Sequence, residues 1–129
     1  MYHEFYDKKA TDTRSEDAHQ VDSIAWLRHN FPTWIVFHVN NEGKKGIGQS
    51  VKDQMKGLLK GVPDILIIPD RTQCKYGFIA IELKRAKKSL SKVSKEQMDF
   101  LDRVNENGGF GALCYGVEQV KVAIADALK

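Results

Sequence analysis

Residues Gly61 to Lys84 read GVPDILIIPDRTQCKYGFIAIELK, and this stretch predicts the centre of the fold. It contains two runs of β-branched and large apolar residues, Ile65–Ile68 and Phe78–Leu83, which are typical of strands. The segment between the runs is polar and has Pro69 and Gly77 at its ends, so it reads as a loop. The stretch therefore predicts two neighbouring strands joined in a hairpin.

Charged residues end the second of these strands. Because side chains alternate between two faces along a strand, Glu82 and Lys84 share one face and the branched aliphatic residues share the other. We therefore expect the aliphatic side chains to be buried without burying the charges. Asp64 stands at the start of the first strand, and paired residues across a sheet lie about 4.5–5.5 Å apart. Asp64 can therefore lie beside Glu82 if the register allows it.

This trio of Asp64, Glu82 and Lys84 suggests a chemistry. Two close carboxylates repel each other unless a cation lies between them, and Mg²⁺ prefers oxygen ligands. The carboxylates would hold the metal, and the Lys84 ammonium would orient a metal-bound water or offset charge during phosphodiester cleavage. The alternative is a solvent-facing salt bridge on an edge strand, which an isolated Glu-x-Lys would favour. The position after an apolar strand, with Pro-Asp at hairpin distance, favours the metal site.

With these motifs the chain, from about residue 15 to 128, resembles the VRR-NUC family of the PD-(D/E)XK nuclease superfamily, especially its small stand-alone members associated with phages. Gly61-Val62-Pro63-Asp64 resembles the family's glycine-proline-aspartate element, and Glu82-Leu83-Lys84 resembles its Glu-x-Lys element. Gln97 is similar to the glutamine on the following helix. Glu16 is similar to the acidic residue on the first helix, although the neighbouring Asp12 or Asp17 could be aligned instead.

The resemblance implies a restriction-endonuclease-like fold and a metal-dependent deoxyribonuclease. It implies Mg²⁺ or Mn²⁺ held by Glu16, Asp64, Glu82 and the backbone carbonyl of Leu83, with Lys84 and Gln97 completing the catalytic set. It also implies branched DNA such as Holliday junctions as the substrate, and a homodimer, since a junction needs paired cuts. Two alternatives remain. One is a flap or single-strand nuclease acting as a monomer, and the other is a non-catalytic DNA-binding module, which would be expected to lack a motif residue.

Two of these residues have a purely structural alternative. Glu16 follows Thr13 by three residues and Gln97 follows Ser94 by three, which is the spacing of a helix capping box. In that motif the side chain at the third helical position bonds to the backbone of the cap residue. Glu16 and Gln97 could therefore act at the metal or only cap their helices.

Composition sets the outer limits. A chain of 129 residues with 42% apolar and 29% charged residues is expected to form one domain over 1–129, with residues 1–11 as a loosely held arm. It has no apolar run of the roughly 18–20 residues that span a membrane and no signal-peptide pattern, so we expect a cytoplasmic protein from a phage or bacterium. Cys74 and Cys114 form no CxxC motif, which agrees with a reducing compartment and with no cysteine zinc site.

The net charge of +3 is unevenly distributed. Arg85, Lys87 and Lys88 follow the second strand of the hairpin and are predicted to contact DNA, the alternative being a solvated loop. Lys44 and Lys45 lie in a glycine-containing loop and could touch a phosphate backbone. This loop lacks the Gly-Lys-Ser/Thr ending, which excludes a nucleotide-binding site of that type.

The remaining chain predicts the order α-β-α-β-β-α-β-α, an α/β fold with a mixed central sheet flanked by helices. Passage from the second hairpin strand through a helix to a strand at Phe110–Tyr115 predicts a parallel pair. We expect His38 to be a partly buried strand residue and not a ligand, and Ser50 to cap a short helix that runs to Leu59. The other expected helices start at Thr13, with an apolar stripe through Ala18, Val21, Ile24, Ala25 and Arg28, and at Ser94 and Val117.

Overall fold

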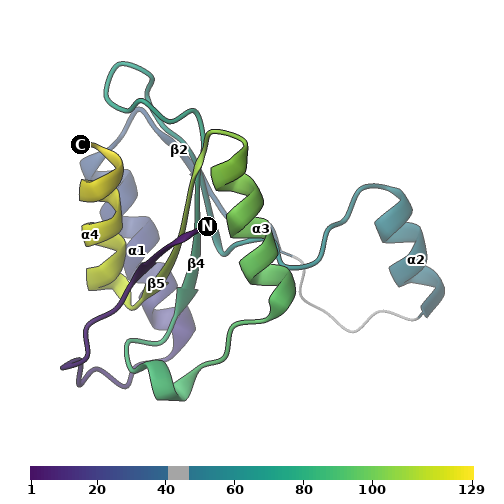
Figure 1. The fold of residues 1–129 in the computed structure, drawn as a ribbon, viewed down its shortest axis with the longest axis horizontal. Coiled ribbons are helices and arrows are strands. Elements are labelled where there is room, and N and C mark those ends of the chain that lie inside the picture. The colour runs from purple at the N-terminus through teal and green to yellow at the C-terminus, as the bar shows by residue number, and fades with distance from the viewer. Residues whose placement is uncertain (41–46) are drawn as a thin grey trace.

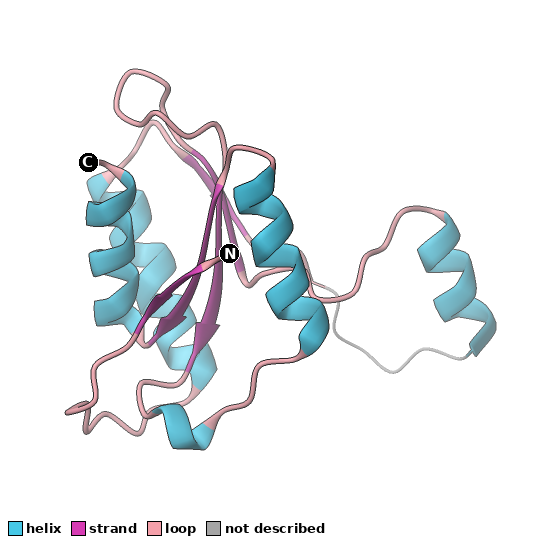
Figure 2. Cartoon of the chain, viewed as in Figure 1, coloured by secondary structure: helices cyan, strands magenta, loops and turns pink. Residues whose placement is uncertain are grey.

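The computed structural model describes residues 1–40 and 47–129. A five-stranded mixed sheet in the order β1-β5-β4-β3-β2 forms the centre, with helices packed against it (Figures 1 and 2), so the predicted α/β class is confirmed. The elements are β1 His3–Phe5, α1 Glu16–Asn30, β2 Ile35–Phe37, α2 Ile47–Met55, β3 Ile65–Ile68, β4 Ile79–Lys84, a 3₁₀ turn Lys88–Leu90, α3 Lys95–Glu106, β5 Phe110–Tyr115 and α4 Val117–Ala127.

The hairpin and the parallel pair are as predicted. β3 pairs antiparallel with β4, with Ile65 opposite Ile81. β4 pairs parallel with β5, with Glu82 opposite Leu113. The same register, continued by one residue, places Asp64 opposite Glu82. β4 therefore lies between two partner strands and forms the middle of the sheet.

Helices cover both faces of the sheet. α1 and α4 lie on one face and α3 lies on the other (Figure 1). One core packs Ile79, Ile81 and Leu83 with side chains from α1 and α4, and a second core packs Ala80 with Leu101 of α3. Because both faces of β4 are covered, Glu82 is only 1% exposed and Lys84 only 7%. The expectation that the charged face stays unburied is therefore wrong.

The N-terminal segment is ordered as a strand and is not a loosely held arm. β1 pairs parallel with β5, His3 opposite Ala112, and the His3 ring stacks on Phe110 with centroids 4.3 Å apart. Three residues are too few to show a periodic pattern, and the hydrogen-bonding groups that order them belong to the edge of β5.

The first helix buries a different stripe from the predicted one. α1 starts at Glu16, not Thr13, and buries His19, Ser23 and Leu27, while Val21 is 68% exposed. His19 Nδ1 accepts from the Val117 amide at 3.1 Å and Ser23 Oγ donates to the His19 carbonyl at 2.7 Å, whereas His19 Nε2 has no hydrogen-bond partner and lies 3.7 Å from Asp12 Oδ2. Such bonds make burial of polar groups tolerable, and a hydrophobic pattern does not show them.

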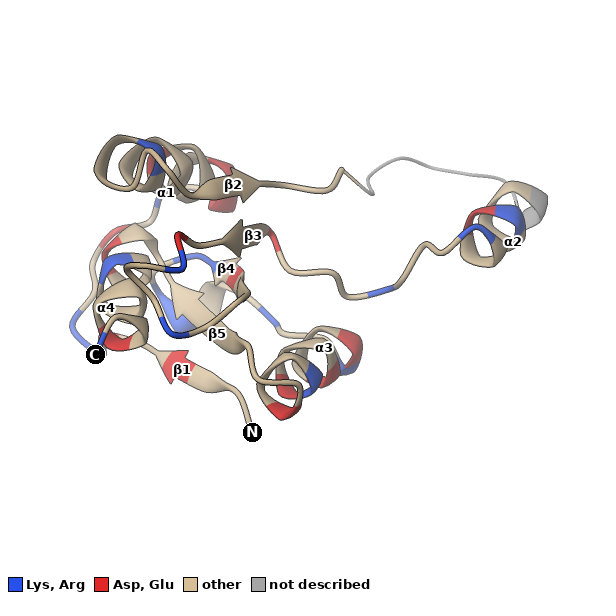
Figure 3. Cartoon of the chain, turned by 90° about the horizontal axis from the view of Figure 1, so that it is seen from above, with Lys and Arg blue, Asp and Glu red and all other residues tan. Residues whose placement is uncertain are grey.

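The connection between β2 and β3 also differs from expectation. β2 ends at Phe37, so His38 lies beyond the strand and is exposed, not partly buried. α2 spans Ile47–Met55, which puts Ser50 inside the helix and not at its cap. Figures 1 and 3 show α2 projecting away from the sheet and its covering helices. Within the described ranges, no helix combines the length and apolar content that crossing a membrane requires.

Candidate functional site

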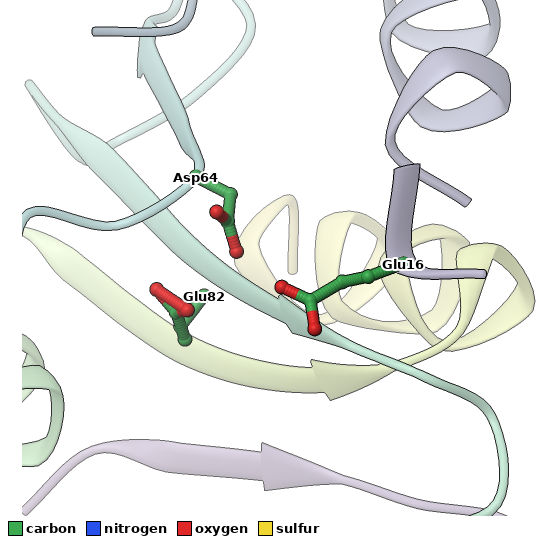
Figure 4. Close-up of side chains that lie close together, drawn as sticks. All are labelled: Glu16, Asp64 and Glu82. Carbon is green, nitrogen blue, oxygen red and sulfur yellow. The ribbon is translucent and has the colours of Figure 1, made fainter. Parts of the chain in front are cut away.

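Three carboxylates from separate parts of the chain converge at the sheet (Figure 4). Glu16 is the first residue of α1, Asp64 directly precedes β3, and Glu82 lies within β4. One oxygen atom of each lies within 4.8 Å of the others. The structure thus brings together the three side chains that the sequence singled out as metal ligands.

Glu82 is the most deeply buried member of this carboxylate cluster. Its Oε2 accepts a hydrogen bond from Gln97 Nε2 at 3.0 Å and lies 3.8 Å from Lys84 Nζ, whereas Oε1 has no hydrogen-bond partner. Burial, followed by the negative charge of Asp64, raises the pKa of the Glu82 carboxyl to about 9. A buried oxygen without a partner is costly, so this atom has the environment expected of a metal ligand.

Asp64 is held by neighbours from two elements, β4 and α1, and from the loop after β2. Its Oδ2 accepts from the backbone amide of Leu83 at 2.8 Å. Its backbone carbonyl lies 2.7 Å from His38 Nδ1 and 3.4 Å from Gln20 Nε2. A carbonyl only accepts, so His38 Nδ1 carries the proton in this contact. The positions of Gln20 and His38 were not foreseen, because side-chain bonds to a distant backbone carbonyl have no sequence pattern.

The backbone of Leu83 also faces the cluster. In an extended strand the N–H and C=O of one residue point to the same side. Since the Leu83 amide donates to Asp64, the Leu83 carbonyl points to the same edge of β4, the edge that faces Asp64. This orientation is compatible with the predicted backbone ligand.

Glu16 is not part of a capping box. The helix is capped by Ser15, whose Oγ accepts from the Ala18 amide at 3.2 Å, and Glu16 occupies the first helical position. The pKa of the Glu16 carboxyl is raised by burial, and the charge of Lys84 opposes that shift. Asp12 instead bonds to Arg14, with Oδ2 3.0 Å from Nη2. Of the acidic residues in this part of the chain, Glu16 is the one that reaches the cluster.

Gln97 caps α3 and also contacts the carboxylate cluster. Its Oε1 accepts from the Ser94 amide at 2.9 Å and its own amide donates to Ser94 Oγ at 3.1 Å, which is a complete capping box. Its Nε2 remains free for Glu82. The helix cap therefore fixes which end of the Gln97 amide faces the carboxylate.

Gly61 brings the glycine-proline-aspartate element against the start of α3. Its φ is +79°, in the left-handed region that favours glycine. A Cβ atom at Gly61 would lie 2.5 Å from the backbone carbonyl of Glu96 and 2.8 Å from the amide of Gln97. Only glycine allows this approach, so the element that carries Asp64 packs directly on the helical turn that carries Gln97.

Lys84 is not a surface salt-bridge residue. It lies in the central strand, its side chain is mostly buried, and its Nζ is 3.8 Å from Glu82 Oε2. The alternative that Glu82 and Lys84 form a solvent-facing salt bridge on an edge strand is therefore wrong. A buried ammonium beside three carboxylates offsets part of their mutual repulsion and can face a reacting phosphate.

The predicted DNA-contacting residues differ in their surroundings. Arg85 is partly buried and donates from Nη2 to the Thr13 carbonyl at 2.6 Å and from Nε to the Arg14 carbonyl at 3.2 Å. Lys88 bonds to Glu4 at 3.2 Å, and its ammonium lies over the rings of Tyr6 and Tyr115. Lys87 is exposed. Lys44 and Lys45 lie outside the described residues.

The donor set fits a hard divalent cation. All three side chains offer carboxylate oxygens, which suit Mg²⁺ and Mn²⁺ better than softer metals. Glu82 Oε1 has no hydrogen-bond partner, and the 4.8 Å limit between the donor atoms of the three carboxylates is close to the roughly 4.2 Å that separates opposite ligands around Mg²⁺.

Comparisons with known proteins agree with this fold. A solved structure described as a VRR_NUC domain protein aligns with a TM-score of 0.69 and 17% identity, over 91% of this chain and 90% of that one. A second, described as a VRR_NUC domain, aligns with a TM-score of 0.50 and 18% identity, over 83% and 95%. No curated protein matches the sequence significantly. The sequence model of the VRR-NUC domain family matches residues 13–118, a range that contains Glu16, Asp64, Glu82, Lys84 and Gln97. This chain therefore belongs to the VRR-NUC domain family, a nuclease-type domain.

Proposed function

We propose that this protein is a Mg²⁺- or Mn²⁺-dependent DNA endonuclease that hydrolyses phosphodiester bonds. The observation that carries the proposal is the unpartnered, buried Oε1 of Glu82 within a cluster that also contains Glu16 and Asp64. A carboxylate in this state needs a proton or a cation, and the neighbouring Lys84 is placed to serve phosphate chemistry.

Each residue of the site has a defined task in this proposal. Glu16, Asp64, Glu82 and the Leu83 carbonyl would hold the cation, which would supply Lewis-acid polarisation of the phosphate and a lowered pKa of the attacking water. Lys84 orients that water or stabilises the negative charge that develops on the phosphate. Gln97 keeps Glu82 Oε2 engaged, so that Oε1 stays directed to the cation.

DNA would approach along the basic residues next to this site. Lys87 follows β4 and is exposed, so its ammonium is available to a phosphate, with Lys88, Lys44 and Lys45 as further proposed contacts. The phosphate contact that the sequence predicts for Arg85 is not part of this proposal, because Nε and Nη2 of its guanidinium bond to backbone carbonyls. A groove of about 620 Å³, lined in part by Gln20, Arg28 and His38, lies next to Asp64 and offers room for the strand beside the cleaved bond.

The proposed substrate is branched DNA such as a Holliday junction, cut by a homodimer. The sequence resemblance supports this substrate, and the geometry supports the dimer, because the described part of one chain holds a single carboxylate cluster while a junction requires two cuts. A monomer acting on flaps or single strands is the alternative enzyme. A non-catalytic DNA-binding module is disfavoured because Asp64, Glu82, Lys84 and Gln97 are all present and adjacent.

The test is cleavage of labelled linear, flap and four-way DNA by the purified chain with Mg²⁺, Mn²⁺ or EDTA, with Glu82→Gln as the matched inactive control. Paired cuts in four-way DNA, together with a dimer mass by light scattering, would support the proposal. Preferential flap or single-strand cleavage by a monomer would favour the alternative enzyme. DNA binding without cleavage under every metal condition would overturn nuclease activity and leave a binding module.

A further inference from the structure

The side chain of Arg85 joins two segments of the chain that carry the carboxylate cluster. Its Nη2 donates to the Thr13 carbonyl at 2.6 Å and its Nε donates to the Arg14 carbonyl at 3.2 Å. Arg85 directly follows Lys84, the last residue of β4, while Thr13 and Arg14 directly precede the cap of the helix that begins with Glu16. The two hydrogen bonds therefore tie the end of the Glu82 strand to the start of the Glu16 helix.

Other contacts of the segment before Glu16 have a different effect. Arg14 bonds to Asp12 at 3.0 Å and to Asp22 of α1 at 2.6 Å, and Ser15 caps the helix. These contacts fix the segment relative to α1 itself. The Arg85 bonds fix it relative to β4, so they set the spacing between the carboxylates of Glu16 and Glu82.

We infer that Arg85 is a positioning residue that places Glu16 for cation binding, and that this is its main contribution to the site. The inference rests on the metal-ligand role that we propose for Glu16. It differs from the phosphate contact that the sequence predicts for Arg85, because the guanidinium nitrogens Nε and Nη2 already bond to backbone carbonyls.

The geometry of the side chain explains why arginine is needed. A guanidinium presents its donors in a rigid planar fork, which can bond to two consecutive carbonyls in one fixed arrangement. A lysine ammonium has the same charge but no fork. Mg²⁺ demands near-ideal ligand geometry, so a small displacement of Glu16 should weaken binding. Arg85→Lys therefore separates positioning, which needs the fork, from phosphate contact, which needs only the charge.

The experiment measures Mn²⁺ binding by calorimetry in the absence of DNA for four proteins: wild type, Arg85→Lys, Glu16→Gln and the double variant. Loss of a residue that orients a metal ligand typically costs about 10–100-fold in metal affinity. We expect a weakening in this range for Arg85→Lys, and no further weakening when it is added to Glu16→Gln. Arg71→Lys, an exposed arginine in the β3–β4 loop, is the matched control and should bind Mn²⁺ as wild type does.

Two results would overturn the inference. One is wild-type Mn²⁺ affinity in Arg85→Lys. The other is an equal loss in the wild-type and Glu16→Gln backgrounds, which would mean that Arg85 acts independently of Glu16. Arg85→Gln, which keeps one amide donor, provides a second folded variant if melting shows that the lysine variant has lost its structure, and the same two outcomes decide it.

DNA binding and DNA cleavage, measured beside Mn²⁺ affinity, distinguish a failure of this inference from a failure of the proposed function. Measured with Ca²⁺ in place of Mg²⁺, DNA affinity and its salt dependence should be unchanged in Arg85→Lys. If wild-type protein binds Mn²⁺ and the Arg85–Glu16 coupling is seen, but no DNA is cut, the nuclease proposal fails and the positioning role stands. If cleavage is metal-dependent but the coupling is absent, the reverse holds.

Discussion

Gln97 Nε2 donates a hydrogen bond to Glu82 Oε2 at 3.0 Å, from the first turn of α3 to the middle of the central strand. The Ser94 amide holds the other end of the Gln97 side chain, so the amide group cannot turn over without losing both bonds. A structural motif that normally only starts a helix thereby also orients a carboxylate of the site.

Mutation can separate the capping of α3 from the orientation of Glu82. Ser94→Ala removes the hydroxyl acceptor but keeps the Ser94 amide, so it should lower stability by about 0.5–2 kcal/mol and leave cleavage close to wild type. Gln97→Ala should lower both stability and cleavage, the latter by roughly 10–100-fold. Thermal melting and single-turnover cleavage on both variants test this. Wild-type cleavage by Gln97→Ala would mean that Gln97 only caps the helix.

Asp64→Asn and Glu82→Gln should each abolish metal-dependent cleavage while the fold is kept. Asn and Gln preserve the side-chain shape but remove the negative charge that a divalent cation requires. Circular dichroism and DNA binding in Ca²⁺ should match those of wild type. If either variant cleaved at the wild-type rate, the proposed ligand set would be wrong.

The raised pKa of Glu82 predicts a pH dependence. In the folded, metal-free protein the carboxyl keeps its proton up to pH about 9, whereas in the unfolded chain it ionises near its ordinary value of 4.5. The unfolded chain therefore binds fewer protons in this window, and the free energy of unfolding of the metal-free protein should fall as pH rises from 4.5 to 9. Melting across this pH range, with Glu82→Gln as the control that lacks this contribution, measures it.

Cation binding should be linked to the same proton. Because Glu82 must ionise to act as a ligand, Mn²⁺ binding near pH 7 should release a proton, and apparent affinity should rise toward pH 9. Calorimetry in buffers of different ionisation enthalpy counts the released protons. Binding with no proton release would show that Glu82 is ionised before the metal arrives.

The role of the Lys84 ammonium can be tested without creating a cavity in the core. Lys84→Met keeps the length of the buried stem and removes the ammonium. We expect cleavage to fall about 10²–10³-fold, as for other groups directed at developing charge, with Mn²⁺ affinity retained. A normal rate with a lowered melting temperature would instead assign Lys84 a structural role.

The basic segment offers two neighbouring lysines with different surroundings. Lys87→Gln should weaken binding to all DNA sequences and reduce the slope of log affinity against log salt by roughly 0.9, the value for one phosphate neutralised on duplex DNA. Lys88→Gln should change this slope less, since Lys88 is already engaged with Glu4, Tyr6 and Tyr115. Equal slopes for wild type and Lys87→Gln would mean that Lys87 is a solvated residue that does not contact DNA.

Local patterns predicted the parts of the site that depend on short stretches of chain. Pro63-Asp64 and Glu82-Leu83-Lys84 each combine an apolar strand with adjacent charges, so the hairpin and its carboxylates were visible in the sequence. The burial of Glu82 and Lys84 was not, because it results from α3, which covers the second face of the sheet.

Contacts between distant segments account for the other differences. β1 is ordered by the edge of β5, and His19 is buried because the Val117 amide provides its partner. The bonds from Gln20 and His38 to the Asp64 carbonyl are of the same kind. Each depends on a backbone N–H or C=O from a distant part of the chain. Apart from the missing N–H of proline, these groups are the same in every residue, so the sequence does not show which of them will become a partner.

The pairing of His3 with Ala112 has a consequence for synthesis on the ribosome. β1 is translated first, yet the strand that it pairs with is 109 positions later. Until β5 emerges, β1 has no partner strand in the sheet, while β2, β3 and β4 emerge consecutively and can pair as neighbours. The nascent sheet is therefore expected to grow from the antiparallel side. The N-terminal strand would close it last, after β5 has left the ribosome.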